Sequence, residues 1–154
     1  MYGFNVKMFF NSKEVISAVD TATRKVLSKF GAFVRRTARQ SIRKRKSVSK
    51  PGQPPTNQTG KLKRHIYFGY DTNKQSVVIG PQQLSGTLTV LSALEYGGTS
   101  YVRENKQVPG PRGGMVRLKT KRAVYIRPRP FMGPAFQKEL PQLPELWRNS
   151  VKTF

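Results

Sequence analysis

The apolar positions of the chain change period from two to between three and four within the first 45 residues. In residues 2–10, Phe4, Val6, Met8 and Phe10 alternate with other residues, which predicts a β-strand. From Ser12 to about Arg45 the apolar or small residues recur at steps of three and four, which predicts one long amphipathic helix. This stripe contains Val15, Val19, Ala22, Val26, Phe30, Phe33 and Thr37.

Period-two patterns return in the middle of the chain. The segments 65–70 and 76–80 flank the turn-forming residues Asp71, Thr72 and Asn73, which predicts a β-hairpin. A single helical turn capped by Thr59 is expected to precede it. Residues 84–96 have a mixed pattern that fits a strand or a helix, and Gly97-Gly98 ends either one. Residues 115–118 and 122–126 alternate apolar with basic residues, which is typical of a two-faced ribbon.

Two segments, 46–58 and 103–114, are predicted to be flexible loops because they lack apolar periodicity and contain Pro-Gly sequences. A second, shorter helix is expected over about 130–140, where Pro141 and Pro144 prevent its continuation. The chain is therefore predicted to form a single α+β domain over residues 1–154. In it, a long N-terminal and a shorter C-terminal helix pack on a four- to five-stranded, mainly antiparallel sheet.

Composition narrows the class of protein. A chain of 154 residues suffices for one domain, and the absence of cysteine leaves no disulfide and no thiolate metal site. No apolar run approaches the length of a membrane span, and no signal peptide is recognisable. We expect a soluble protein that is made in the cytoplasm and does not contact membranes.

The formal net charge of +22 indicates a polyanionic or acidic partner. Between residues 35 and 64 there are eleven basic residues and no acid, and between residues 103 and 129 there are nine basic residues and one acid, Glu104. The pattern does not decide whether the two blocks form one surface or two. The residues expected to contact double-stranded DNA non-specifically, or acidic neighbouring proteins, are Arg35, Arg36, Arg39, Arg43, Lys44, Arg45, Lys46, Lys61, Lys63 and Arg64.

Catalysis has little support in the sequence. His65 is the single histidine and lies within an alternating strand pattern, so a structural or surface role is favoured. The seven acidic residues are scattered, without the spacing of an acid–base pair or a two-metal site. The glycines of 109–114 lack the Lys-Ser/Thr ending of a phosphate-binding loop. We therefore expect no enzymatic activity, no cofactor and no metal.

The most informative segment is Arg127–Phe136, called the elbow below, with the sequence Arg-Pro-Arg-Pro-Phe-Met-Gly-Pro-Ala-Phe. Its spaced prolines keep the first half extended and display two arginines, and Pro134 suits the first turn of a helix. Phe131 and Met132 are left as apolar groups at the bend. Such a segment suits docking, because it contains no nucleophile, base or metal ligand.

Together with two other segments, the elbow resembles a family of small phage minor tail and neck proteins, which complete the tail or join it to the head. The segment Pro51-Gly52-Gln53-Pro54-Pro55-Thr56, followed by Thr59-Gly60-Lys61-Leu62-Lys63-Arg64-His65-Ile66, is similar to the family's Pro-Gly-x-Pro-Pro turn and Thr-Gly-x-Leu-x-x-Ser-Ile motif. Leu94-Glu95-Tyr96-Gly97 is similar to its Glu-Phe-Gly-Thr motif. His65 replaces a usual serine, an extra glycine precedes Thr99, and about thirty residues separate the last two motifs. The likeness spans roughly residues 12–140.

The resemblance implies a structural virion protein of the neck or tail top. It would form a ring of six copies, alternatively twelve, through which DNA passes, beside other neck, portal-adaptor or tail-tube proteins, after assembly in the host cytoplasm. The alternative is a basic nucleic-acid-binding protein outside any virion. The expected subunit-interface residues are Glu95, Tyr96, Arg127, Arg129, Phe131 and Met132.

Two of these interface residues have a second interpretation. The Glu95 carboxylate could pair across the interface with Arg127 or Arg129, or form an internal salt bridge that orders the turn at Gly97. Phe131 could dock on a neighbour or fill the protein's own core, and core packing is favoured.

Overall fold

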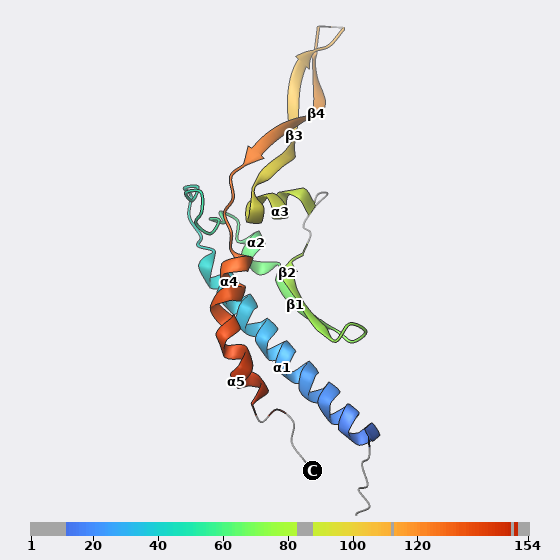
Figure 1. Ribbon diagram of the computed structural model, residues 1–154. Coiled ribbons are helices and arrows are strands. Elements are labelled where there is room, and N and C mark those ends of the chain that lie inside the picture. The colour runs from blue at the N-terminus through green and yellow to red at the C-terminus, as the bar shows by residue number, and fades with distance from the viewer. Residues whose placement is uncertain (1–11, 83–87, 112, 149, 151–154) are drawn as a thin grey trace, which may run out of the picture.

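A computed structural model describes residues 12–82, 88–111, 113–148 and 150 (Figure 1). The predicted strand 2–10 lies outside the described residues. The helices are α1 (Ser12–Ser41), α2 (Lys61–Arg64), α3 (Leu88–Tyr96), α4 (Met132–Glu139) and α5 (Leu143–Trp147), with a 3-10 turn at Leu140–Gln142 between the last two. The strands are β1 (Ile66–Asp71), β2 (Ser76–Pro81), β3 (Gly98–Pro109) and β4 (Met115–Ile126).

Helix α1 is the long helix that the periodicity predicts, but its buried stripe differs from the predicted one. The buried residues advance mostly four at a time, through Ala22, Val26, Phe30, Val34 and Ala38, and Ile42 follows just after the helix. Val15 and Val19 are exposed, and Phe33 and Thr37 are only half-buried. The stripe shifts because α4 and the β1–β2 hairpin contact α1 from two sides, which the helix period alone does not specify (Figure 1).

The β1–β2 hairpin forms as predicted, with Asp71 opposite Ser76 at the turn and Ile66 opposite Pro81 at the other end. The Asp71 carboxylate accepts hydrogen bonds from the backbone N–H groups of Asn73 (3.0 Å) and Lys74 (3.2 Å), which closes the turn. Helix α1 approaches this hairpin closely at Gly31. A Cβ atom there would lie 2.8 Å from Val77 Cγ2, so this contact requires glycine.

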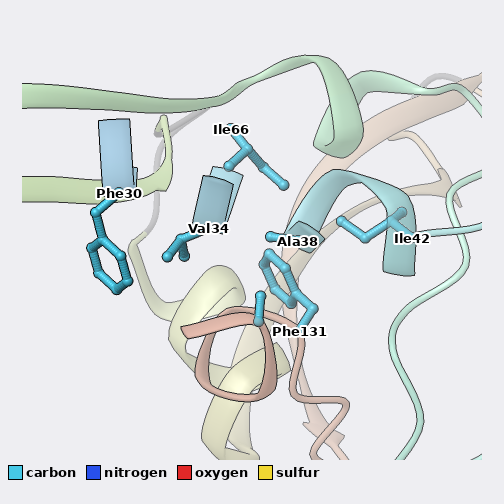
Figure 2. Packing of buried hydrophobic residues seen from close by; sticks show 7 residues of the cluster. Phe30, Val34, Ala38, Ile42, Ile66 and Phe131 are labelled. Atoms are coloured by element: carbon cyan, nitrogen blue, oxygen red, sulfur yellow. The ribbon is translucent and has the colours of Figure 1, made fainter. Parts of the chain in front are cut away.

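The core lies between the second half of α1, the start of β1, and α4 (Figure 2). Phe131 is 1% exposed and packs with Val34, Ala38, Ile42 and Ile66, and its ring fills the space between α1 and α4. Burying an aromatic side chain of this size is among the largest single contributions to folding. The core-packing interpretation of Phe131 is therefore confirmed.

The prediction of one four- to five-stranded sheet is wrong, although the α+β class is confirmed. Among the described residues there are two separate two-stranded antiparallel sheets, β1–β2 and β3–β4. Strands β3 and β4 pair with each other over their whole length, from Gly98 opposite Ile126 to Pro109 opposite Met115. They project from the body beyond α3 (Figure 1), so no edge meets the β1–β2 hairpin. Residues 98–126 are called the arm below.

The predicted loop at 103–114 is also wrong for most of its length, because residues 103–109 belong to β3. Only residues 110–114 connect the strands, and the Gly110 N–H donates to the Gly114 carbonyl oxygen at 2.6 Å. Gly113 has a φ of 77°, a conformation that favours glycine. The two short ribbons expected at 115–118 and 122–126 are one continuous strand. This part of β3 is exposed on both faces, so residues 103–107 are polar and lack the alternation from which a strand is predicted.

Candidate nucleic-acid and subunit interfaces

The first candidate site is the basic surface formed by the end of α1, the following loop and α2, called the α1–α2 surface below. Arg35 and Arg39 lie one helical turn apart on α1, and both donate to backbone carbonyls of segment 63–66, which begins within α2. Arg35 Nε donates to the Ile66 oxygen and Arg39 Nε to the Lys63 oxygen, each at 2.8 Å. These bonds attach the segment 63–66 to the side of α1 and bring the two groups of cations together.

Aromatic rings orient two of these arginines. The Arg35 guanidinium lies 5.8 Å from the centre of the Tyr67 ring, and that of Arg36 lies 5.1 Å from the centre of the Phe33 ring. Together with Arg39, these two arginines line a shallow depression of about 360 Å³. The hydrogen bonds of Arg35 and Arg39 use the Nε position, so these two bonds do not occupy the terminal N–H donors of either guanidinium group.

The basic run after α1 lies against the proline-rich loop. Arg43 and Thr56 form an isolated parallel β-bridge, and the Asn57 N–H donates to the Arg43 carbonyl at 3.0 Å. Arg43 and Arg45 line a cleft of about 670 Å³ together with Lys50. Lys44 and Lys46 are exposed beside it. Helix α1 therefore ends at Ser41, four residues earlier than predicted, because residues 42–46 turn to meet this loop.

The cations of the α1–α2 surface have no carboxylate partner among the described residues. The two ion pairs found among the described residues are Arg122–Glu104 (3.5 Å) and Arg148–Glu145 (2.9 Å), and neither belongs to the α1–α2 surface. Lys61, Lys63 and Arg64 are exposed on α2. A surface of like charges without internal neutralisation attracts anions. The second basic block lies mostly on the arm, so the two blocks form separate surfaces (Figure 1).

The second candidate site is the elbow, where the structure brings together the three segments that carry the family resemblance. The Gly52 N–H of the proline-rich loop donates to the Pro128 oxygen at 2.9 Å, and Arg129 Nε donates to the Ser49 oxygen at 3.1 Å. The Arg129 N–H donates to the Leu94 oxygen of α3 at 2.6 Å. Residues some 35 to 80 positions apart in the chain thus meet at one junction.

Glu95 is the central group of this junction, and its role differs from both interpretations of the sequence. Its carboxylate accepts hydrogen bonds from the N–H groups of Phe131 (3.0 Å), Met132 (3.1 Å) and Gly133 (2.7 Å). These are N–H groups at the start of α4, which have no partner within the helix, and a negative charge there also favours the helix dipole. Among the described residues it forms no ion pair with Arg127 or Arg129. Glu95 is therefore an internal cap of α4.

The other residues of this group differ in accessibility. Tyr96 is 84% exposed and Arg127 is exposed, whereas Met132 is half-buried against the core. Gly97, with a φ of 80°, turns the chain between Tyr96 and the arm, and a Cβ atom there would lie 3.0 Å from Pro128 Cδ. Tyr96 and Arg127 are thus the members of the predicted interface set that remain available to a neighbour.

Sequence reasoning missed the acceptors that hold the elbow in place. These are the backbone oxygens of Ser49, Leu94 and Pro128. The order of side chains along the sequence does not indicate where a backbone carbonyl will lie in the folded chain. It also missed the role of Glu139, which is 4% exposed and accepts hydrogen bonds from Thr37 Oγ1 and Gln142 Nε2. Glu139 lies four residues after the apolar Ala135, a helical spacing that could have placed both on the face that meets α1.

Groups suited to chemistry are scattered. Across the described ranges, no set of three or more His, Asp or Glu side chains is close enough to hold a metal ion. His65 Nδ1 lies 2.8 Å from the Lys61 oxygen, and its ring meets Tyr67 edge to face. No helix within the described residues is long and apolar enough to cross a membrane.

Comparison of this chain with protein-family models, with curated proteins and with solved structures gave no match.

Proposed function

We propose that this protein is a non-enzymatic structural component of a phage virion, placed at the neck or tail top, where it completes the tail or joins it to the head. Copies of the chain assemble into a ring of six, alternatively twelve, through which double-stranded DNA passes. Adjacent neck, portal-adaptor or tail-tube proteins are its other partners. Assembly takes place in the host cytoplasm before the ring enters the particle.

The observation that carries this proposal is the convergence of three sequence motifs on the elbow. The proline-rich loop, the Leu94–Gly97 segment and residues 127–136 are far apart in sequence, yet backbone hydrogen bonds join them. The motifs of an enzyme family bring reactive side chains together. The three motifs of this chain instead bring together main-chain hydrogen-bonding groups and a buried phenylalanine, Phe131. What the motifs specify is a rigid junction, and a rigid junction is what a subunit needs in order to present fixed surfaces to its neighbours.

Exposed groups beside the junction give it contact surfaces. Tyr96 is a large aromatic side chain that is almost fully exposed. Arg127 is also exposed and follows Ile126, the register partner of Gly98. Tyrosine and arginine are enriched in the well-packed centres of protein interfaces. The α1–α2 surface supplies cations that pair with no carboxylate of the described residues, and these would contact the phosphates of the DNA within the ring without reading its sequence.

The test is the mass of the purified protein by analytical ultracentrifugation, without DNA and with duplex DNA, at low and high salt. We expect a closed oligomer that persists at high salt, either alone or after addition of the neighbouring neck protein. Arg127→Glu should prevent assembly and leave the melting temperature unchanged. Arg24→Glu makes the same charge change on an exposed part of α1 and should assemble normally. Assembly of both variants, or of neither, contradicts the proposed interface.

One observation favours the alternative, a nucleic-acid-binding protein outside any virion. The net charge of +22 and the unpaired cations of the α1–α2 surface would serve such a protein equally well. A chain that stays monomeric with every neck partner and binds duplex DNA tightly only at low salt supports this alternative. Density for the protein in a map of the intact particle excludes it.

A further inference from the structure

The two faces of the arm differ sharply in chemistry. Side chains alternate between the faces of a strand, and in the register of this hairpin even-numbered residues of β3 lie opposite even-numbered residues of β4. The even-numbered face contains the branched apolar residues Val102, Val108, Val116, Leu118, Val124 and Ile126, and its three charged residues, Glu104, Lys106 and Arg122, leave it a net charge of only +1. The odd-numbered face contains four cations and no acid: Arg103, Arg117, Lys119 and Lys121, called the cationic face below.

Burial at the base of the arm shows which of its two faces contacts the body. Ser100 is fully buried and Val124 and Ile126 are half-buried, at the end of the arm that contacts α3. Farther out, Val102 and Leu118 are 46% and 48% exposed. At its base, the arm therefore meets the body with its even-numbered face, and beyond the base both faces are exposed.

The cationic face has no internal neutralisation. Arg103 lies directly opposite Lys121, and Lys119 and Arg117 follow at every second position of β4, opposite Asn105 and Gln107. Like charges directly opposite each other destabilise a strand pair. The one carboxylate of the arm, Glu104, lies on the other face and is 3.5 Å from Arg122. Cations that repel one another on an exposed ribbon favour the binding of a polyanion, which offsets the repulsion.

We propose that the cationic face of the arm binds the phosphate backbone of duplex DNA. This inference rests on the proposed function, and it names a DNA-contacting site separate from the α1–α2 surface. Cations at every second strand position are about 7 Å apart, a spacing that lets neighbouring side chains reach successive phosphates along one DNA strand. The distal part of the face carries amides and cations, which are backbone-contacting groups.

Duplex DNA fits this face better than a single strand does. Proteins that bind single strands interleave cations with aromatic rings on which bases stack. Here the aromatic residues of the odd-numbered face, Tyr101 and Tyr125, both lie at the base of the arm. The part that carries Arg103, Arg117, Lys119 and Lys121 has no ring between the cations.

The experiment measures binding of the full chain to a labelled duplex of random sequence by fluorescence anisotropy over a range of salt concentrations. One variant replaces the four cations of the cationic face by glutamine. Each phosphate contact contributes about 0.9 to the slope of log K against log salt, so the slope should fall by about 3.6 if all four are in contact. Affinity near 0.1 M salt should fall at least about tenfold.

Two control variants separate a specific face from net charge. The first makes the same charge change at exposed lysines elsewhere, by replacing Lys13, Lys25, Lys29 and Lys74 with glutamine. The second alters the opposite face of the arm, by replacing Val102 and Leu118 with threonine, which keeps strand propensity. Both should retain the wild-type slope. All variants should melt within about 2 °C of the wild type, because the replaced side chains are exposed.

Three results would overturn the inference. The first is a wild-type slope in the cationic-face variant, and the second is an equal loss in the lysine control. The third is tighter binding to a single strand or to polyglutamate than to duplex DNA. Failure of the proposed function is read separately, from oligomer mass in the same samples without DNA. A protein that binds duplex DNA through the arm but never assembles refutes the ring and leaves the arm site standing.

Discussion

Replacing Glu95 with alanine should uncap α4 and loosen the elbow. The carboxylate accepts three backbone N–H groups, from Phe131, Met132 and Gly133, at 2.7 to 3.1 Å. Two of these bonds are part-buried, so water replaces the lost acceptor poorly. The substitution removes the three hydrogen bonds that join the Glu95 side chain of α3 to the start of α4, so its cost measures how firmly α3 holds α4.

The cost follows from the contacts. Loss of a helix cap typically costs about 0.5–2 kcal/mol, and a hydrogen bond to a charged group contributes about 1.5–3 kcal/mol. The three bonds share one carboxylate and do not add, so we expect Glu95→Ala to lower the free energy of unfolding by about 2–4 kcal/mol. At about 2–4 °C for each kcal/mol in a chain near this size, the melting temperature should fall by roughly 4–16 °C.

Thermal and urea unfolding, followed by circular dichroism and by fluorescence of the single tryptophan, Trp147, provide the measurement. Glu95→Gln keeps one acceptor oxygen and should lie between the wild type and Glu95→Ala. Glu145→Gln is the control, since Glu145 forms an exposed ion pair with Arg148 and should change stability by less than about 1 kcal/mol. If Glu95→Ala unfolds within about 0.5 kcal/mol of the wild type, the carboxylate does not hold the elbow.

The remaining predictions concern the core. Phe131→Ala should lower the free energy of unfolding in urea by about 3–5 kcal/mol, because the ring is 1% exposed. Tyr96→Ala, at an 84% exposed position, should lower it by less than about 0.5 kcal/mol. Equal losses in the two variants would contradict the assignment of Phe131 to the core. Gly31→Val should lower the free energy of unfolding by about 1–3 kcal/mol, since even a Cβ atom would meet Val77 at 2.8 Å. Gly69→Val introduces the same side chain where a Cβ atom meets nothing within 4 Å, and it is the matched control for the melting temperature. Glu139→Ala should cost about 1–3 kcal/mol by leaving Thr37 and Gln142 without their shared acceptor, and an unchanged urea midpoint would show that water replaces the carboxylate.

Local sequence determined the elements that local interactions stabilise. The three-to-four period of residues 12–41 specifies α1, and the turn residues 71–73 between two alternating segments specify the β1–β2 hairpin. Spaced prolines likewise kept residues 127–130 out of any helix and allowed α4 to begin at Met132. These features depend on residues only a few positions apart, so their pattern is visible in the chain itself.

Tertiary structure alone decided which elements meet. Pairing of β3 with β4 over their whole length, and their separation from β1–β2, depend on contacts that no local period reports. The same holds for Glu95, whose partners are 36 to 38 residues away and are backbone N–H groups without a sequence signature. The charge pattern likewise predicted an anionic partner, but the strand register was needed to show that four cations of the arm share one face. The chemistry of each side chain can be predicted from the sequence. The positions of backbone donors, and the set of side chains that lie on one face of a strand pair, are determined only when the chain folds.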